Sequence, residues 1–515
     1  MDKMQTTFFD GSVPSELSGD FILPDTYPDV KKILRVRARP VQIGRFMSGG
    51  KLEFNGAVDY IVLFSADGES GDTLHSVHFA AEYASSVTPA ESVPDPITVI
   101  EPRITACSAR LQNPRKLSLK STVMTDVKLS KILTTSPVCE PDAKLERLDE
   151  TLPTLIECSF TADHEQISEN LEPDAAQPAI DEIITCDAEI YFREAKPQIA
   201  DDGFTVALKG EAVIDCIYKA QTESGDYRSF SRKIPLSFVV SADEYADMFK
   251  DSIPGTLQAV ATGTPTEINA AVGEDAYGER RILELDLSFD IDVTLFADAE
   301  TSMTLDAYST DHESECTGKT LDILNIGKIV ASNFSVNESA PREELGLPGD
   351  SERVWNVIDC QAGVTMNSAS VAKGRAQVGG EALVSLILSE RVGSGCELAS
   401  CEFRLPVKCE LSVGEVKEPI SFAADCKAFD LRARIDQSRV SCDFEVALSA
   451  ALISRSRREI IESVRLGDEI RRDDSDNSTI ILCYPAPGES LWQVAKRYNR
   501  TVDSLTETGN VVRIR

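Results

Sequence analysis

Few residues of this chain combine the types and the spacing that catalysis requires. Four histidines occur among 515 residues. Two of them, His75 and His78, stand three apart in an expected strand, where they would face opposite sides and make poor metal ligands. Gly318-Lys319-Thr320 has the ending of a phosphate-binding loop, but Glu313 occupies the place of that loop's first glycine. The sequence therefore predicts no catalytic site, no metal site and no cofactor.

Acidic residues dominate the charge of the chain. It has 85 acidic and 52 basic residues, giving a formal net charge of -33. With so many carboxylates, no single pair indicates glycosidase chemistry. Such a negative field repels phosphate backbones and anionic membrane surfaces, which excludes nucleic acid as an expected partner. Solubility is the simplest interpretation of the acidity, and an acidic docking surface is the alternative.

Apolar segments long enough for targeting or membrane insertion are missing from the sequence. No run of about 20 apolar residues occurs, and the opening MDKMQTTFFDGSVPSELSGDF lacks the apolar stretch of a signal peptide. We therefore expect no transmembrane segment and a protein that stays in the cytoplasm of the cell that makes it.

The thirteen cysteines form no CxxC pair and are odd in number. Buried, reduced thiols explain them more simply than a disulfide framework or a zinc site. Four cysteines replace aliphatic residues in apolar runs, namely Cys186, Cys216, Cys360 and Cys442. Three others are expected to be exposed and open to late oxidative cross-linking: Cys316, Cys396 and Cys401.

Three segments of the chain share one pattern. They read VKKILRVRA at 30–38, IDEIITCDA at 180–188 and VWNVIDCQA at 354–362. A second block follows each of them after a similar interval, and the glycines of these blocks align: Gly56, Gly210 and Gly380. Agreement in two blocks at similar spacing, three times over, predicts three copies of one unit.

The period of these blocks is that of β-strands. The second blocks are runs of about nine residues rich in β-branched and aromatic residues, and the glycine at the start of each predicts a bulge or a close backbone approach. A later run at 282–296 alternates between apolar residues and polar, mostly acidic, residues. The expected fold class is mainly β, with three repeated sandwich-like units or open barrels at 1–159, 160–333 and 334–468.

Acidic stretches separate the expected units. Those at about 139–178 and 306–350 are expected to be linkers or loops over sheet edges, although their apolar residues indicate that part of each belongs to a unit. A charged linker is expected at 469–478. The composition then changes, and 479–515 is expected to be a small α+β domain that begins with a β-rich run at 479–484.

Helix signals follow that run. Ser490 has Gln493 three residues on, which predicts a capping box at the start of a helix. One apolar stripe follows at helical spacing: Leu491, Val494, Ala495 and Tyr498. Thr501 is expected to cap a second helix, and 511–514 to return as a strand. The expected order is therefore strand, helix, helix, strand (βααβ).

This order and the string PGESLWQVAKRYNRTVDSL resemble the LysM domain, although the closing part is shorter than usual. LysM domains bind N-acetylglucosamine polymers, such as peptidoglycan, in a shallow groove. The resemblance implies a groove, for a glycan or a protein partner, formed by Pro487, Gly488, Glu489, Ser490, Leu491 and Trp492, with Thr508, Gly509 and Asn510 opposite. Turn and cap chemistry is the alternative role of Gly488 and Ser490, and core packing is that of Trp492.

The repeat starts resemble the SPOCS domain of spore-envelope morphogenetic proteins, best in ILPDTYPDVKKILRVRA followed by GKLEFNGAVDYIVLF. SPOCS units joined to one C-terminal LysM domain are the layout of the SipL type. The resemblance implies a non-enzymatic scaffold of the spore coat in the mother cell, gathered at the forespore surface. Its LysM domain would dock a coat basement-layer morphogenetic ATPase and other coat proteins. A peptidoglycan-binding protein of the cell wall or spore cortex is the alternative.

Overall fold

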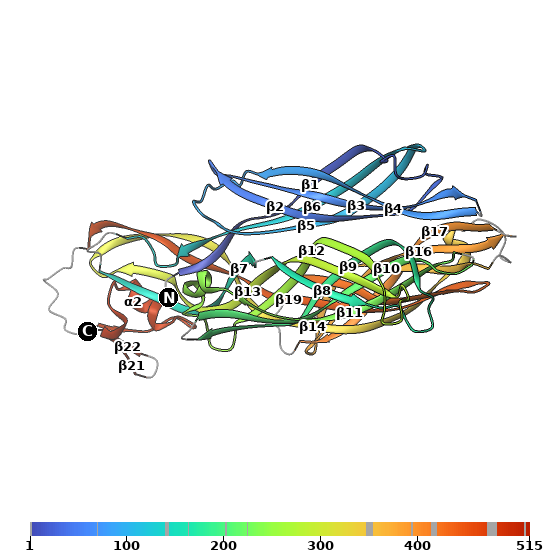
Figure 1. The fold of residues 1–515 in the computed structure, drawn as a ribbon. Helices are drawn as coiled ribbons and strands as arrows, with labels where there is room; N and C mark the ends of the chain where they lie inside the picture. Colours follow the sequence, from blue (N-terminus) through green and yellow to red (C-terminus); the bar gives the residue numbers. More distant parts are fainter. Residues whose placement is uncertain are drawn as a thin grey trace.

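A computed structural model describes residues 3–69, 71–139, 144–162, 164–200, 203–223, 225–346, 354–392, 395–413, 420–470, 481–508 and 511–514. Strands hold 78% of these residues and helices 4%, which confirms the expectation of a mainly β protein. The strands that the structure describes form five sheets. Figure 1 shows β1–β6 as a layer above the other long strands, with the small C-terminal module at one end.

The first strand group forms an open barrel of two facing sheets. Its sheets have the orders β1-β6-β5 and β4-β3-β2, and β2 lies against β5 while β1 lies against β4. Apolar side chains such as Tyr60, Phe64 and Leu117 fill the space between the sheets. The strands are β1 (Lys3–Ile22), β2 (Lys32–Ser48), β3 (Lys51–Gly68), β4 (Gly71–Val87), β5 (Ile97–Asn113) and β6 (Lys116–Thr134).

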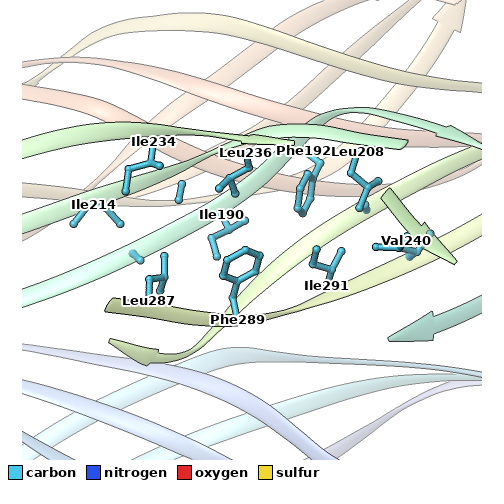
Figure 2. Close-up of a cluster of buried hydrophobic side chains, with 14 of the residues drawn as sticks. Ile190, Phe192, Leu208, Ile214, Ile234, Leu236, Val240, Leu287, Phe289 and Ile291 are labelled. Carbon is cyan, nitrogen blue, oxygen red and sulfur yellow. The ribbon is translucent and has the colours of Figure 1, made fainter. Parts of the chain in front are cut away.

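The second strand group repeats this pairing order. β8 and β12 both pair with β13, and β9-β10-β11 is a meander that joins β12 through a short ladder. Figure 2 shows its core, where Ile190 and Phe192 of β9 face Phe289 and Ile291 of β13. The elements are β8 (Glu165–Leu171), β9 (Ile180–Ala200), β10 (Gly203–Ala220), β11 (Tyr227–Ser241), η1 (Asp243–Tyr245), α1 (Ala246–Phe249), β12 (Gln258–Gly273) and β13 (Ile282–Ser309).

The third strand group has the same order again. β14 and β18 pair with β19, and β15-β16-β17 is the meander. In each group, therefore, the first and fifth strands flank the sixth, and the second to fourth strands form a meander, which in the second group continues into the sheet of β12 and β13. The elements are β14 (His312–Pro341), η2 (Arg342–Leu345), β15 (Asn356–Ala372), β16 (Arg375–Val392), β17 (Gly395–Ser412), β18 (Ile420–Ile435) and β19 (Arg439–Glu469).

The aligned glycines lie where two backbones approach closely. Gly56, Gly210 and Gly380 each border a β-bulge in the register with the preceding strand. A Cβ atom would lie 2.5 Å from a carbonyl oxygen at Gly56, 2.1 Å at Gly210 and 2.0 Å at Gly380. The bulge and the close approach predicted at these positions are therefore confirmed.

A second bulge in each group re-aims one side chain. The register of β2 with β3 skips Leu34, and the equivalent ladders skip Ile184 and Ile358. Because a bulge breaks the alternation of faces, Leu34 leaves the barrel core in which Ile33 and Val36 pack. The three skipped residues meet one another instead.

These residues belong to an apolar cluster that we call the hub. Each strand group contributes three residues at equivalent places, one each from its second, third and fourth strands. β4 contacts β9, β11 contacts β15 and β17 contacts β2, so the contacts run in a closed cycle around the three groups. The hub consists of Leu34, Leu63, Leu74, Ile184, Ile217, Tyr227, Ile358, Ile387 and Leu398.

Long strands extend beyond the barrels and build a second core. β7 (Leu145–Thr161) pairs with the later half of β13, and the early half of β14 pairs with the later half of β19. Leu155, Phe296 and Ile326 pack between these ribbons. The stretches at 139–178 and 306–350, expected to be linkers or loops, therefore contain strands β7, β8 and β14, as their apolar residues indicated. The expected boundary 159/160 falls inside β7, and 333/334 falls inside β14.

Candidate functional site

The C-terminal module is the candidate binding site from the sequence. Its elements are β20 (Ile481–Cys483), α2 (Leu491–Arg497), η3 (Val502–Ser504), β21 (Leu505–Thr508) and β22 (Val511–Ile514), with β22 between the other two strands. The second helix expected after Thr501 is only a 3₁₀ turn. The residues after it pair with β22 instead, with Leu505 opposite Ile514. The strand-helix-helix-strand order expected for this module is therefore not the order observed.

The start of α2 is held by local hydrogen bonds. The Ser490 side chain accepts from the Gln493 N–H, and the Gln493 side chain accepts from the Ser490 N–H at 2.8 Å, which confirms the capping box. Gly488 has φ +85°, as its turn requires. The Glu489 carboxylate accepts from the Ala486 N–H at 2.8 Å and pairs with Arg497 at 3.0 Å. Turn and cap chemistry thus accounts for Gly488, Glu489 and Ser490.

The two sides of the expected groove lie at one end of the small sheet. Cys483 pairs with Val512, and Thr508 pairs with Val511, so the chain leaves β20 near the end of β21 and the start of β22. Pro487 and Gly488 are exposed, whereas Leu491 packs against the module core. Gly509 and Asn510 lie outside the described residues, and so does the side chain of Thr508.

Trp492 is directed toward the body of the protein. Its Nε1–H donates to Asp306 Oδ2 at 2.8 Å, and Lys496 Nζ donates to Asp306 Oδ1 at 2.5 Å. The Tyr308 ring meets the Trp492 ring edge to face, with centroids 4.9 Å apart. The Tyr308 hydroxyl donates to the Arg500 carbonyl at 2.6 Å. We call these interactions the docking contact.

The protonation states of Asp306 and Tyr308 at neutral pH favour the docking contact. Burial opposes ionisation of Asp306, but hydrogen bonds from Lys496 and Trp492 hold the pKa of this carboxyl below its usual value. Burial raises the pKa of Tyr308 to about 12, so its hydroxyl stays protonated and able to donate. Sequence reasoning missed both residues because it placed Asp306 at the start of a linker. The alternation of TSMTLDAYS was the one signal that β13 continues there.

A second concentration of charged residues surrounds the hub. Arg35 on β2 pairs with Asp359 on β15 and donates to the Ser385 hydroxyl at 3.0 Å. Arg37 and Arg39 of the same strand both pair with Asp187 on β9. The first strand group is therefore joined to the third and to the second by separate ion pairs. The aligned repeat starts contained the signal, since Arg35 aligns with Asp359 and Arg37 aligns with Asp187.

Equivalent serines join the groups as well. The Ser76 hydroxyl of β4 donates to the carbonyl of Ile184, and the Ser229 hydroxyl of β11 donates to that of Ile358 at 2.7 Å. Ser400 takes the same place on β17, because it pairs with Ile387 as Ser76 pairs with Leu63. The same type of contact therefore links the first group to the second and the second to the third.

One carboxyl near the hub has an unusual proton affinity. Burial, with the nearby carboxylate of Asp359, raises the pKa of Asp215 to about 6. The neighbouring Asp187 behaves oppositely, because Arg37 and Arg39 hold its pKa below the usual value despite its burial. The arrangement binds strand groups to one another.

The thirteen cysteines are all free. Cys186, Cys216 and Cys442 are buried as expected, and Cys360 is half-buried. The expectation of exposure is wrong for Cys401, which is buried on β17, and for Cys316 and Cys396, which are half-buried; each lies on a strand covered by a neighbouring element. Cys139 is the exposed cysteine.

Other site classes find little support in the described part of the chain. Over those residues, no cluster of three or more histidine, cysteine or acidic side chains could hold a metal ion. Nor does any helix there have the length and apolarity to cross a membrane. A hollow of about 510 Å³ lies over β2–β4 beside Arg45, Phe46 and Lys51, away from the docking contact. No protein-family model, no curated protein and no solved structure matches this chain.

Proposed function

We propose that this protein is a non-enzymatic scaffold of the spore coat, built from three SPOCS-like units followed by a LysM-like docking module. The module would bind a coat basement-layer morphogenetic ATPase at the forespore surface, and the units would present surfaces to other coat proteins. The proposal combines the resemblance of the sequence with the arrangement of the strands.

The repeat part of the proposal is supported by three independent coincidences. The strand groups share one pairing order. Their aligned glycines border equivalent bulges, and their second bulges fall on Leu34, Ile184 and Ile358. If the three barrels resembled one another by chance, two β-bulges would not fall at equivalent positions in each of them. We therefore treat each strand group as one unit.

The hub is the single observation that carries the scaffold proposal. Residues from three units meet at equivalent places, and buried ion pairs specify which unit lies beside which. Like-built domains on a flexible linker would move independently, whereas this centre holds them in one body. A rigid body that displays several β surfaces suits multivalent assembly, in which weak contacts add up to stable recruitment.

Peptidoglycan binding is the second candidate. Tyr484 is 74% exposed beside the exposed Pro487 and Gly488, and an open aromatic ring can stack on a sugar. Trp492 and Lys496, however, are engaged by Asp306 in this structure. The protein-docking proposal therefore has the stronger geometric support.

The test uses a fluorescent fusion in sporulating cells, expressed as the full chain and as a chain that ends at residue 470. We expect the full chain to gather at the forespore and the shortened chain to remain diffuse. In parallel, the purified full chain is offered coat extract and purified peptidoglycan. Binding to peptidoglycan alone would favour the second candidate, and equal localisation of both fusions would contradict the proposed role of the module.

A further inference from the structure

We propose that the docking contact keeps the C-terminal module closed, and that the face of α2 used there recognises a protein segment bearing a carboxylate beside an aromatic ring. This inference rests on the proposed function, because it names the kind of protein the module would dock. Such a partner would have to displace Asp306 and Tyr308 of β13.

Two donors of α2 converge on one carboxylate. Trp492 and Lys496 stand four residues apart, on one face of the helix, and each binds a different oxygen of Asp306. Charge-assisted bonds of this type are the stronger class of hydrogen bond. This face is therefore selective for an anion with two free oxygens rather than for a neutral sugar.

The aromatic requirement follows from the core of the module. Tyr308 is 1% exposed and belongs to the apolar cluster of the module, with Val494, Leu505 and Val512. Removal of this ring would open the cluster to water, because the cluster is completed by a residue of another domain. A ligand that supplies a ring at the same place restores the burial. Asp306 and Tyr308 are two residues apart on a strand, so their side chains share one face.

A partner can compete with Asp306 for α2, because part of the docking contact is exposed to solvent. The side chains of Lys496 and Asp306 remain 42% and 29% exposed, so their ion pair contributes little on its own.

The experiment compares three full-length proteins: wild type, Asp306→Asn and the matched control Asp286→Asn. Asp286 lies on the same strand β13, outside the docking contact. Hydrogen exchange of the α2 amides reports opening of the module, and exchange in β9 and β10 reports the integrity of the body. The probe is a labelled peptide, TSMTLDAYSTDH, which copies residues 301–312.

We expect Asp306→Asn to raise α2 exchange roughly tenfold, through the loss of charge-assisted bonds, and to bind the peptide. The wild type and Asp286→Asn should stay protected and bind the peptide weakly. A peptide with Asn in place of Asp306 and Ala in place of Tyr308 should not bind to any of the three proteins. Lys496→Gln, made on the module side, should open the module in the same way.

Equal α2 exchange in wild type, Asp306→Asn and Lys496→Gln would overturn the closed state. Equal binding of the altered peptide would overturn the recognition of a carboxylate beside a ring. Failure of the proposed function is distinguishable from both, because it would appear as unchanged forespore localisation after truncation while the exchange and peptide results stand.

Discussion

Asp215 offers the sharpest test of the charged surroundings of the hub. Its carboxyl faces Asp359 of β15, Asp187 of β9, Arg37 of β2 and the Ser231 hydroxyl of β11. Burial and Asp359 raise its pKa from 3.8 to about 6. A raised carboxyl pKa means that the folded state binds the proton more tightly than the unfolded chain, so ionisation costs stability as the pH rises through this range.

The magnitude follows from the shift. At about 1.4 kcal/mol per pKa unit, the ionised carboxyl lowers the free energy of unfolding by about 3 kcal/mol at pH 7.5. Asp215→Asn keeps the shape and removes the charge. We expect the variant to exceed the wild type by about 3 kcal/mol at pH 7.5, by about 2 kcal/mol at pH 5.5 and by about 0.5 kcal/mol at pH 4.

The assay is urea unfolding followed by tryptophan fluorescence at these three pH values. Trp355, which is 4% exposed in the core of the third strand group, reports unfolding close to the hub. Asp286→Asn on the wet face of β13 serves as the matched control and should give no gain. A gain that is equal at pH 4 and pH 7.5, or no gain at all, would refute the assignment of a buried, repelled carboxylate.

Three further predictions concern packing, pairing and reactivity. Gly380→Ala should destabilise the protein by about 3 kcal/mol or more, since the new Cβ would meet a carbonyl oxygen at 2.0 Å, whereas Gly363→Ala, with nothing within 4 Å, should change thermal stability little. Arg35→Met should lower the free energy of unfolding by about 3–5 kcal/mol, because it leaves the buried carboxylate of Asp359 without its partner. In a double-mutant cycle, adding Asp359→Met should recover most of this loss. Additive losses from the two changes would contradict the pairing. Native alkylation with peptide mapping should label Cys139 first, because burial raises the pKa of thiols such as Cys158 and Cys186 to about 12; early labelling of Cys401 would be inconsistent with its burial.

The local features of this fold were accessible from sequence because they depend on nearby residues. Alternation of apolar and polar residues marks the strands, and a glycine inside a β run marks a bulge, so Gly210 and Gly380 were placed correctly. The capping box of Ser490 and Gln493 likewise needs only two residues that stand three apart. Such signals fix elements but carry no information about which elements meet.

The hub depends on partners that lie far apart in the chain. The sequence pattern around Leu34 is compatible with a position inside its own barrel or outside it. The β-bulge at Leu34 determines that its side chain lies outside. Its neighbours Ile184 and Ile358 are 150 and 324 residues away. The second helix of the module was predicted wrongly for a similar reason. Leu505 fits an amphipathic helix, but the pairing of β21 with β22 satisfies more backbone groups than one isolated turn.

The candidate groove was predicted from resemblance, and the structure assigns several of its residues to local support. Gly488, Glu489 and Ser490 build the turn and the cap. Trp492 binds a carboxylate from β13, 186 residues away in sequence. No periodicity in the C-terminal residues could reveal that partner, because the spacing of residues on a helix shows its apolar face without showing what covers it.

The central claim is that three like-built units close around one centre, and zero-length carbodiimide cross-linking with mass spectrometry tests it most directly. Lys427 lies 3.3 Å from Glu189, and Lys233 pairs with Asp430, so both links would join the second unit to the third. We predict both cross-links within the monomer band at low protein concentration. Their absence from the monomer, or their presence only in a dimer band, would contradict the contact between the second and third units, on which the closed arrangement depends.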